Sequence, residues 1–245
     1  MGILSVNSVL CMLVLHANAL LAIAKLQIMK DNSEPHVTTR SAAKAATRQR
    51  ILTAAREQLA QGGAARLSMR QIADRVGLVP SALYKHVPTK DALLTELIVE
   101  AYRRLAVSIS AAGPTWQARA TALRAWALKN PHEFYLIYGT PVTGYQAPEE
   151  TIEPAASVFR CFVEATDSPA GQDHTIPGRP VLPAAVAKQL NPLAKETGHS
   201  EAFLAGALAS VSQLVGMILL ELGGHFVGSV APADEFFAWV TTVDC

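Results

Sequence analysis

The sequence predicts an all-α protein with a small amino-terminal domain and a larger carboxy-terminal helical domain. Apolar residues recur at helical spacing along most of the chain, and half of its 245 residues are apolar, enough for a sizeable core. Glycine, proline and hydroxyl residues stand where helix stops and caps are expected. The predicted parts are an extension and arm over 1–40, a three-helix domain over 41–109, and a helical domain over 110–245.

The opening segment has no clear structural role. Residues 1–24 contain no Asp, Glu, Lys or Arg and are mostly apolar. About 20 apolar residues would suffice for a membrane span, but His16 and two asparagines interrupt the run, and no basic residues precede it as they would in a signal peptide. Three interpretations stay open: a start codon placed too early, with Met29 beginning the ordinary polar segment, an additional amphipathic helix, or a membrane anchor. Residues 30–41 are polar and predict a disordered arm.

The next segments predict three short helices. The first runs from about Ala45 or Thr47 to Gln61 and ends at two glycines. Ser68 and Gln71 form a capping box for the second, in which the Gln71 side chain reaches back to the Ser68 amide. Gly77 ends that helix in a left-handed conformation.

The third helix is expected over Pro80 to His86. Pro80 suits a first helical turn, whereas Pro88 disfavours helical geometry at Val87. Thr89 then caps a longer helix over about 91–109. A turn of about three residues between the second and third helices has the length that helix-turn-helix units use.

Two sequence segments carry a family resemblance. MRQIADRVGL, residues 69–78, and LYKHVPTKDALL, residues 83–94, resemble the tetracycline-repressor-like (TetR) family of one-component transcriptional regulators. The resemblance covers about residues 47–105, with two departures. Val79 replaces a frequent serine or threonine cap, which leaves one cap or phosphate contact open, and Val87 replaces the usual phenylalanine.

The charge distribution agrees with a DNA-binding role. The chain has a formal net charge of only +1, yet residues 40–90 hold ten Lys or Arg against two Asp or Glu, a net charge of +8. Residues 91–245 hold nine against sixteen, a net charge of −7. Basic charge is thus concentrated in the segment with the helix-turn-helix pattern, as binding to phosphates requires.

Candidate DNA contacts follow from chemistry and from the resemblance. Side chains near the start of a recognition helix meet base edges in the major groove; among them, Ser81 and Lys85 can form hydrogen bonds. The resemblance implies phosphate contacts for Tyr84, His86 and Lys90, although a tyrosine half in the core and a packed histidine remain alternatives. Arg48 contacts a phosphate or stays solvated. The predicted set is Arg48, Ser68, Arg70, Pro80, Ser81, Ala82, Tyr84, Lys85, His86 and Lys90.

The carboxy-terminal domain is expected to be entirely helical. Its boundary is placed near 109–113, after which Thr115 caps a helix that ends at Asn130. A short helix then reaches Tyr138 and stops at Gly139, a further helix carries Ile152, Ala156, Phe159 and Val163 on one face, and 166–183 predict a long loop. These segments resemble the ligand-binding and dimerisation domain of one subgroup of the family. The candidate ligand-binding residues are Trp126, His132, Tyr138, Phe159, Phe162, Gln213 and Met217, each of which is alternatively plain core.

Residues 201–222 are apolar almost all round. Such a helix lies in a protein core or a membrane, and its serines and Gln213 favour the core. The resemblance implies that this helix and the aromatic segment 235–240 build the interface of a homodimer.

Enzyme signatures such as HExxH, GxSxG and CxxC are lacking, and three cysteines without disulfide or metal spacing suit a reducing cytoplasm. We therefore expect a cytoplasmic homodimeric repressor that is not an enzyme and needs no cofactor or metal. It would bind a palindromic operator in double-stranded DNA and be released by a small hydrophobic or aromatic effector, without contacting a membrane. The alternatives are a membrane-associated helical adaptor and a small-molecule-binding protein without DNA function.

Overall fold

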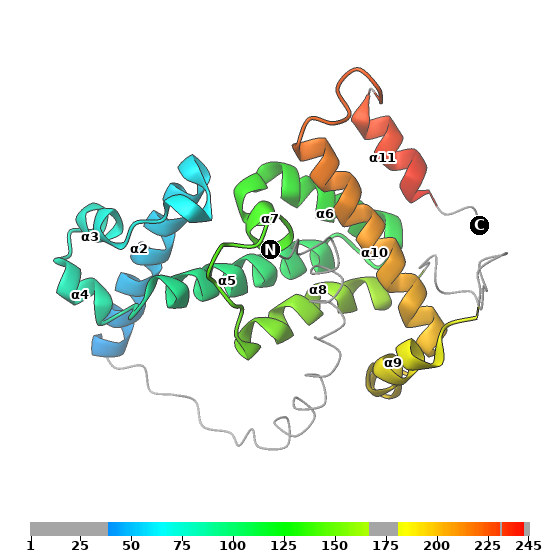
Figure 1. Ribbon diagram of the computed structural model, residues 1–245, viewed down its shortest axis with the longest axis horizontal. Helices are drawn as coiled ribbons and strands as arrows, with labels where there is room; N and C mark the ends of the chain where they lie inside the picture. The colour runs from blue at the N-terminus through cyan, green and yellow to red at the C-terminus, as the bar shows by residue number, and fades with distance from the viewer. Residues whose placement is uncertain (1–38, 167–180, 231, 243–245) are drawn as a thin grey trace, which may run out of the picture.

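The computed structural model describes residues 39–166, 181–230 and 232–242, and within these ranges the chain forms only helices and turns (Figure 1). The predicted all-α fold is therefore confirmed. The predicted extension and most of the predicted arm, together with most of the predicted loop over 166–183, lie outside the described residues. The arm is shorter than predicted, because α2 begins at Thr39.

Three helices form the amino-terminal bundle. Helix α2 spans Thr39–Gly62, a 3-10 turn follows over Ala64–Arg66, and α3 and α4 span Met69–Val76 and Pro80–Tyr84. The expected start of α2 at residue 45 or 47 is wrong by about two turns. Its first residues are exposed in the part whose burial is described, so no apolar stripe marks them in the sequence. The buried residues of this bundle are Ile51, Leu52, Ala54, Ala55, Leu59, Leu67, Ile72, Ala73, Val76, Leu83 and Val87.

Helix α5 (Lys90–Ala111) joins the two halves of the molecule. The Thr89 hydroxyl accepts from the Ala92 amide at 3.0 Å, which confirms the predicted cap. The first two turns contribute Leu93, Leu94 and Leu97 to the amino-terminal core. From Ala101 onward, the buried residues of α5 belong to the larger core instead. One continuous helix therefore packs in both domains, and the core changes well before the predicted boundary at its end.

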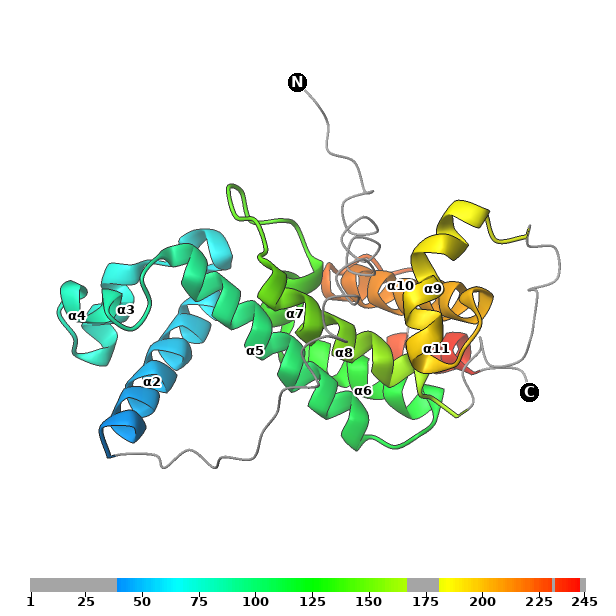
Figure 2. The same cartoon turned by 90° about the horizontal axis from the view of Figure 1, so that it is seen from below.

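Four elements pack against α5. They are α6 (Trp116–Lys129), α7 (Pro131–Tyr138), the turn η3 (Glu149–Thr151) and α8 (Ile152–Val163). The Thr115 hydroxyl caps α6, as predicted, by accepting from the Ala118 amide. In two views at right angles, α8 and α6 run beside α5 along the body of the molecule (Figures 1 and 2).

The last three helices are α9 (Ala184–Thr197), α10 (Glu201–Leu222) and α11 (Ala233–Thr241). Helix α10 has the bounds that the sequence predicts. Helix α9 was not predicted, and Pro192 in its interior explains why, since proline ordinarily breaks a helix. Helices α9 and α10 share a small core around Leu190, Leu193 and Leu204. These helices lie at the opposite end of the molecule from α3 and α4 (Figure 1).

Candidate nucleic-acid interface

The first helix of the helix-turn-helix unit is held by contacts from α2. The Ser68 hydroxyl accepts from the Gln71 amide at 3.4 Å, as expected. The reciprocal half of the predicted capping box is wrong: Gln58 of α2 accepts from the Ser68 amide at 3.0 Å, while its side-chain nitrogen donates to Gln71 at 3.3 Å. The side-chain amide of Gln58 thus takes the place that was expected for the side-chain amide of Gln71. Because Gln58 belongs to α2, the cap also fixes α3 against α2.

The turn between α3 and α4 depends on Gly77. Its φ is 71°, in the left-handed region that glycine tolerates best. The Gly77 amide donates to the Asp74 carbonyl at 3.2 Å, and the Leu78 amide donates to the Ala73 carbonyl at 2.9 Å. This pair of bonds is the Schellman arrangement, which satisfies the free carbonyls at a helix end. It turns the chain sharply enough for α4 to cross α3.

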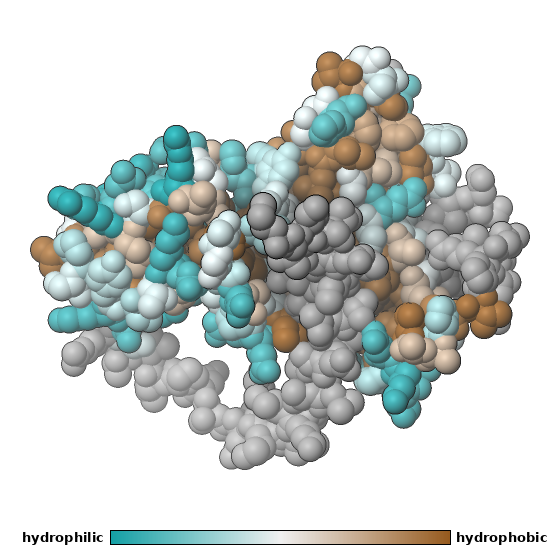
Figure 3. All heavy atoms as spheres, viewed as in Figure 1, coloured by the Kyte–Doolittle hydropathy of each residue, from teal (hydrophilic) through white to brown (hydrophobic). Residues whose placement is uncertain are grey.

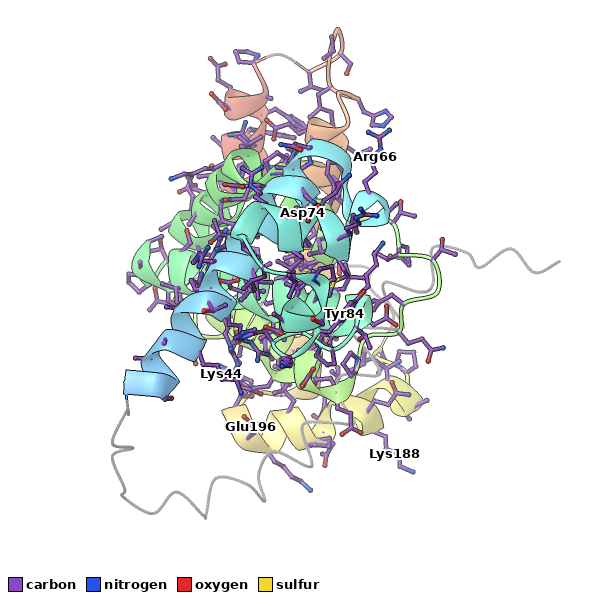
Figure 4. All side chains as sticks on the ribbon, turned by 90° about the vertical axis from the view of Figure 1, so that its left-hand side faces the viewer. Lys44, Arg66, Asp74, Tyr84, Lys188 and Glu196 are labelled. Carbon is purple, nitrogen blue, oxygen red and sulfur yellow. The ribbon has the colours of Figure 1, made fainter. Side chains whose placement is uncertain are left out.

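Helix α4 presents its polar side chains to the surface. Leu83 is fully buried, and it fixes which face of this short helix turns outward. Pro80, Ser81 and Lys85 are exposed, and Tyr84 is 48% exposed. Figure 4 looks directly at this end of the molecule, with Tyr84 near its centre. Four predicted contact residues therefore lie together on one accessible face.

The start of α4 lacks a side-chain cap, as the sequence predicts. Val79 precedes the helix with its side chain 65% exposed, and it provides no side-chain cap. The helix ends at Tyr84 rather than His86. Its backbone bonding continues as a tightened turn in which the His86 amide donates to the Leu83 carbonyl at 2.9 Å. Pro88 then disfavours another helical turn.

Two predicted phosphate ligands flank this face. His86 is half-buried, and its Nδ1 atom is buried without a hydrogen-bond partner among the described residues. Lys90 is the first residue of α5, where the helix dipole adds to its charge. Its Nζ atom donates to the Ala65 carbonyl at 3.4 Å. A bond of that length is weak, so Lys90 remains available to an anion.

The remaining predicted contacts differ in their surroundings. Arg70 is exposed on α3, and Ala82 is half-buried. Arg48 forms a two-point ion pair with Glu96 of α5, with both nitrogen–oxygen distances at 2.7 Å. Sequence reasoning missed this partner because the two residues are 48 positions apart. The spacing of Glu96 and Glu100, one turn apart on α5, was the signal available, since Glu100 pairs with Arg56 through a single contact at 3.2 Å.

The predicted ligand-binding residues divide into two groups. Five of them pack in or against the larger core, namely Trp126, Tyr138, Phe159, Phe162 and Met217. The other two, His132 and Gln213, are exposed. The structure therefore does not bring all seven together, and their role as a ligand site stays a prediction.

The aromatic residues of the core are closely packed. Phe162 is fully buried and meets the Trp116 ring edge-on, with centroids 5.1 Å apart. Tyr138 meets Tyr102 in the same manner at 5.9 Å. Burial raises the pKa of Tyr138, and that of Tyr102, well above the ordinary value of a tyrosine. Both tyrosines are therefore neutral hydrogen-bonding groups in an apolar setting, which is the chemistry that small-molecule sites use.

A depression of about 440 Å³ is lined by residues of α5 and α6 and by Asn130, which follows α6. Trp126 is the one predicted ligand-binding residue in its lining, which consists of Arg104, Ser108, Ala125, Trp126, Lys129 and Asn130.

Comparison with known proteins supports the helix-turn-helix assignment. Residues 51–97 match the family described as bacterial regulatory proteins, tetR family, and residues 116–243 match the tetracyclin repressor-like, C-terminal domain. The HTH-type transcriptional regulator Mb1846 of Mycobacterium bovis is 41% identical over 126 residues, which are 47% of this chain and 54% of that protein. The chain thus spans about half the length of the curated relatives it matches.

Solved structures share the fold over a greater length. The crystal structure of the regulatory protein SCO4313 has a TM-score of 0.70 and 34% identity, over 83% of this chain and 97% of that one. A protein of unknown function from Rhodococcus sp. RHA1 has a TM-score of 0.54 and 23% identity, over 80% and 91% of the two chains. The helix-turn-helix unit, the carboxy-terminal match and the likeness to SCO4313 agree, and the chain belongs to the tetracycline-repressor-like (TetR) family of transcriptional regulators.

Proposed function

We propose that this regulator is a ligand-responsive repressor that binds a palindromic operator as a homodimer and is released by a small hydrophobic or aromatic effector. The observation that carries this proposal is the continuity of α5. Its first turns hold the core beneath α3 and α4, and its later turns lie in the core that contains the aromatic cluster. A change in that core is therefore transmitted through a rigid helix to the DNA-binding end.

The α4 surface supports recognition of double-stranded DNA. Ser81 and Lys85 provide exposed hydrogen-bonding groups at the two ends of α4, Tyr84 is exposed on the same helix, and Lys90 begins α5. A helix of this kind enters the major groove, where each base pair presents a distinct set of donors and acceptors. A single short helix contacts few base pairs, so high specificity favours two copies on two half-sites.

The far end of the molecule supports pairing of two copies. Helix α10 is apolar over 22 residues, yet only a third of its most apolar window is buried within the protomer. Leu220 is 45% exposed, and Trp239 of α11 is 74% exposed. Figure 3 shows brown, hydrophobic residues over the end of α10 and the turn toward α11. A contiguous apolar surface of this kind is usually covered by a partner.

A membrane-associated adaptor is the second candidate. Helix α10 has the length and hydropathy of a membrane span, a property that buried core helices share. Cell fractionation without detergent separates the two candidates. Recovery of the full chain in the soluble fraction excludes the adaptor, whereas retention in the membrane fraction supports it.

Binding selection on random double-stranded DNA tests the regulator proposal. Two inverted half-sites, centred about 10 bp or a multiple of this apart, are the expected result, because two α4 helices related by a two-fold axis reach successive major grooves. Enrichment of a single half-site without an inverted repeat would exclude the dimeric mode. An absence of any enriched sequence would exclude operator recognition.

A further inference from the structure

The depression between α5 and α6 has a positively charged lining. Its volume of about 440 Å³ falls in the range of small-molecule sites. Two of its six lining residues carry a positive charge, and none carries a negative charge. Residues one helical turn apart share a face of a helix, and the lining consists of three such pairs: Arg104 and Ser108 on α5, Ala125 and Lys129 on α6, and Trp126 with Asn130 at the end of α6.

This part of the chain has a charge opposite to that of the segment that follows it. Residues 101–132 contain five basic residues and no acidic residue, whereas residues 133–245 contain four basic and thirteen acidic residues. Two of the five basic residues are bound internally. Arg119 donates to two backbone carbonyls, and Arg124 pairs with two acidic side chains. The remaining three include both cations of the depression.

Arg104 is held in place while part of its guanidinium group stays available. Its Nη2 atom donates to the Glu133 carboxylate and, at 3.3 Å, to the side-chain oxygen of Asn130. Asn130 is itself fixed, because its amide nitrogen donates to the Trp126 carbonyl at 2.8 Å. The guanidinium carbon lies 6.0 Å from the centroid of the Trp126 ring, within reach of a cation–π contact. Nε and Nη1 have no acceptor among the described residues, so an oriented cation retains free donors.

Lys129 and Ser108 complete the polar part of the lining. Lys129 is exposed and Ser108 is half-buried, and neither side chain forms a hydrogen bond or ion pair within the described part of the chain. Trp126, which is only 8% exposed, and Ala125 supply apolar surface beside them. Two cations and a hydroxyl next to an indole match an anion that is attached to an apolar body.

We propose that this depression binds a small aromatic carboxylate, with the carboxylate between Arg104 and Lys129 and the ring against Trp126 and Ala125. The inference goes beyond the proposed function, because binding here requires neither DNA nor a second copy of the chain. Guanidinium groups form strong charge-assisted hydrogen bonds with carboxylates. A bound carboxylate would share Arg104 with Glu133, so the two carboxylates compete for the same guanidinium group.

Cinnamate is the probe, cinnamamide is its uncharged counterpart, and acetate is the carboxylate without a ring. Binding is followed by NMR of the isotopically labelled full chain through the indole N–H signal of Trp126, assigned with Trp126→Phe. The signals of Trp116 and Trp239 report on other places in the molecule. A ligand of the size of cinnamate should bind in about the millimolar range and shift the Trp126 signal. Cinnamamide and acetate should each bind several-fold more weakly.

Three variants test the assignment of the side chains. Lys129→Ala should weaken cinnamate binding about two- to fivefold, because an exposed charge pair contributes modestly. Glu133→Gln should strengthen it, since the substitution removes the carboxylate that occupies Nη2 of Arg104. Arg103→Ala is the matched control: Arg103 is exposed on α5 next to Arg104 but does not line the depression, and its loss should leave the affinity unchanged.

Equal affinity for cinnamate and cinnamamide would overturn the role of the carboxylate, and equal affinity for cinnamate and acetate would overturn the role of the ring. A loss with Arg103→Ala as large as that with Lys129→Ala would show general attraction of anions and overturn the site. Weaker binding to Glu133→Gln would contradict the competition for Arg104. A shift of the Trp239 signal without one of Trp126 would place the ligand elsewhere. Each of these outcomes leaves the proposed operator binding untouched.

Discussion

The hydroxyl oxygen of Tyr145 lies 2.8 Å from the hydroxyl oxygen of Thr95. Thr95 is buried on α5, and its hydroxyl donates to the Asp91 carbonyl at 2.9 Å. Since a threonine hydroxyl has one proton, Tyr145 must be the donor in the contact between them. The loop that follows α7 therefore reaches the first turns of α5, where Tyr145 and Val142 pack against the amino-terminal core.

Tyr145→Phe should destabilise the protein by about 1 kcal/mol, because it removes one partly buried hydrogen bond while retaining the ring. The measurement is the free energy of unfolding in urea. Tyr135→Phe is the control, since Tyr135 is exposed on α7. Equal unfolding free energies for wild type and Tyr145→Phe would show that this bond contributes nothing to the attachment of the loop.

Lys90→Ala should weaken binding to every duplex, operator or not, and reduce the salt slope by about one, because the lysine neutralises a phosphate at a helix start. Fluorescence anisotropy at several salt concentrations measures both quantities. Lys195→Ala, an exposed lysine on α9, is the control. Unchanged affinity would remove Lys90 from the DNA contacts.

Lys85→Ala and Ser81→Ala should change sequence preference rather than general affinity. Each side chain is exposed on α4 and can form hydrogen bonds to base edges, and a good base contact contributes about 1–3 kcal/mol of discrimination. Repeating the binding selection with each variant measures this effect. Recovery of the wild-type operator with undiminished preference at all positions would show that neither side chain contacts base edges.

Glu133→Gln should change how stability depends on pH. Burial raises the pKa of Glu133, although the nearby Arg104 and Arg56 guanidinium groups oppose the shift and Glu100 reinforces it. The folded protein thus binds this proton more tightly than the unfolded chain does. Stability contributed by Glu133 is therefore greater at low pH and declines as pH rises from its ordinary pKa through the raised one.

Urea unfolding of the wild type and Glu133→Gln over about pH 4 to 7 tests this sign. The wild type should lose stability relative to the variant as pH rises, since glutamine does not titrate. Glu149→Gln, at an exposed site in η3, is the control. An opposite trend would show that the ion pair with Arg104 outweighs burial.

Leu220→Glu should convert the proposed dimer into a monomer, because it places a charge in the exposed apolar surface of α10. Light scattering after size exclusion measures the mass. Val107→Glu is the control, since Val107 is 69% exposed on α5. A variant that stays dimeric would show that the interface does not include this end of α10. A monomeric wild type would refute the proposed dimer.

Helix ends were predicted well where their signals are local. Thr89 and Thr115 cap their helices through the amide three positions later, and Gly77 closes a turn within five residues. Prediction failed where a distant residue intervened. Gln58 takes the place expected for Gln71 at the Ser68 amide, and Pro192 lies within a helix that packing against α10 supports. Tertiary contacts override local preference because each can contribute as much free energy as a cap.

The sequence by itself determined the all-α class, the helix-turn-helix unit and the charge asymmetry, because periodicity, caps and composition act over a few residues. Only the tertiary structure decided which charges remain free. Arg48 is paired with Glu96, Lys44 is not paired among the described residues, and Tyr145 reaches Thr95 across fifty positions. Such pairings depend on how helices pack, since side chains far apart in sequence meet only after the cores beneath them have formed.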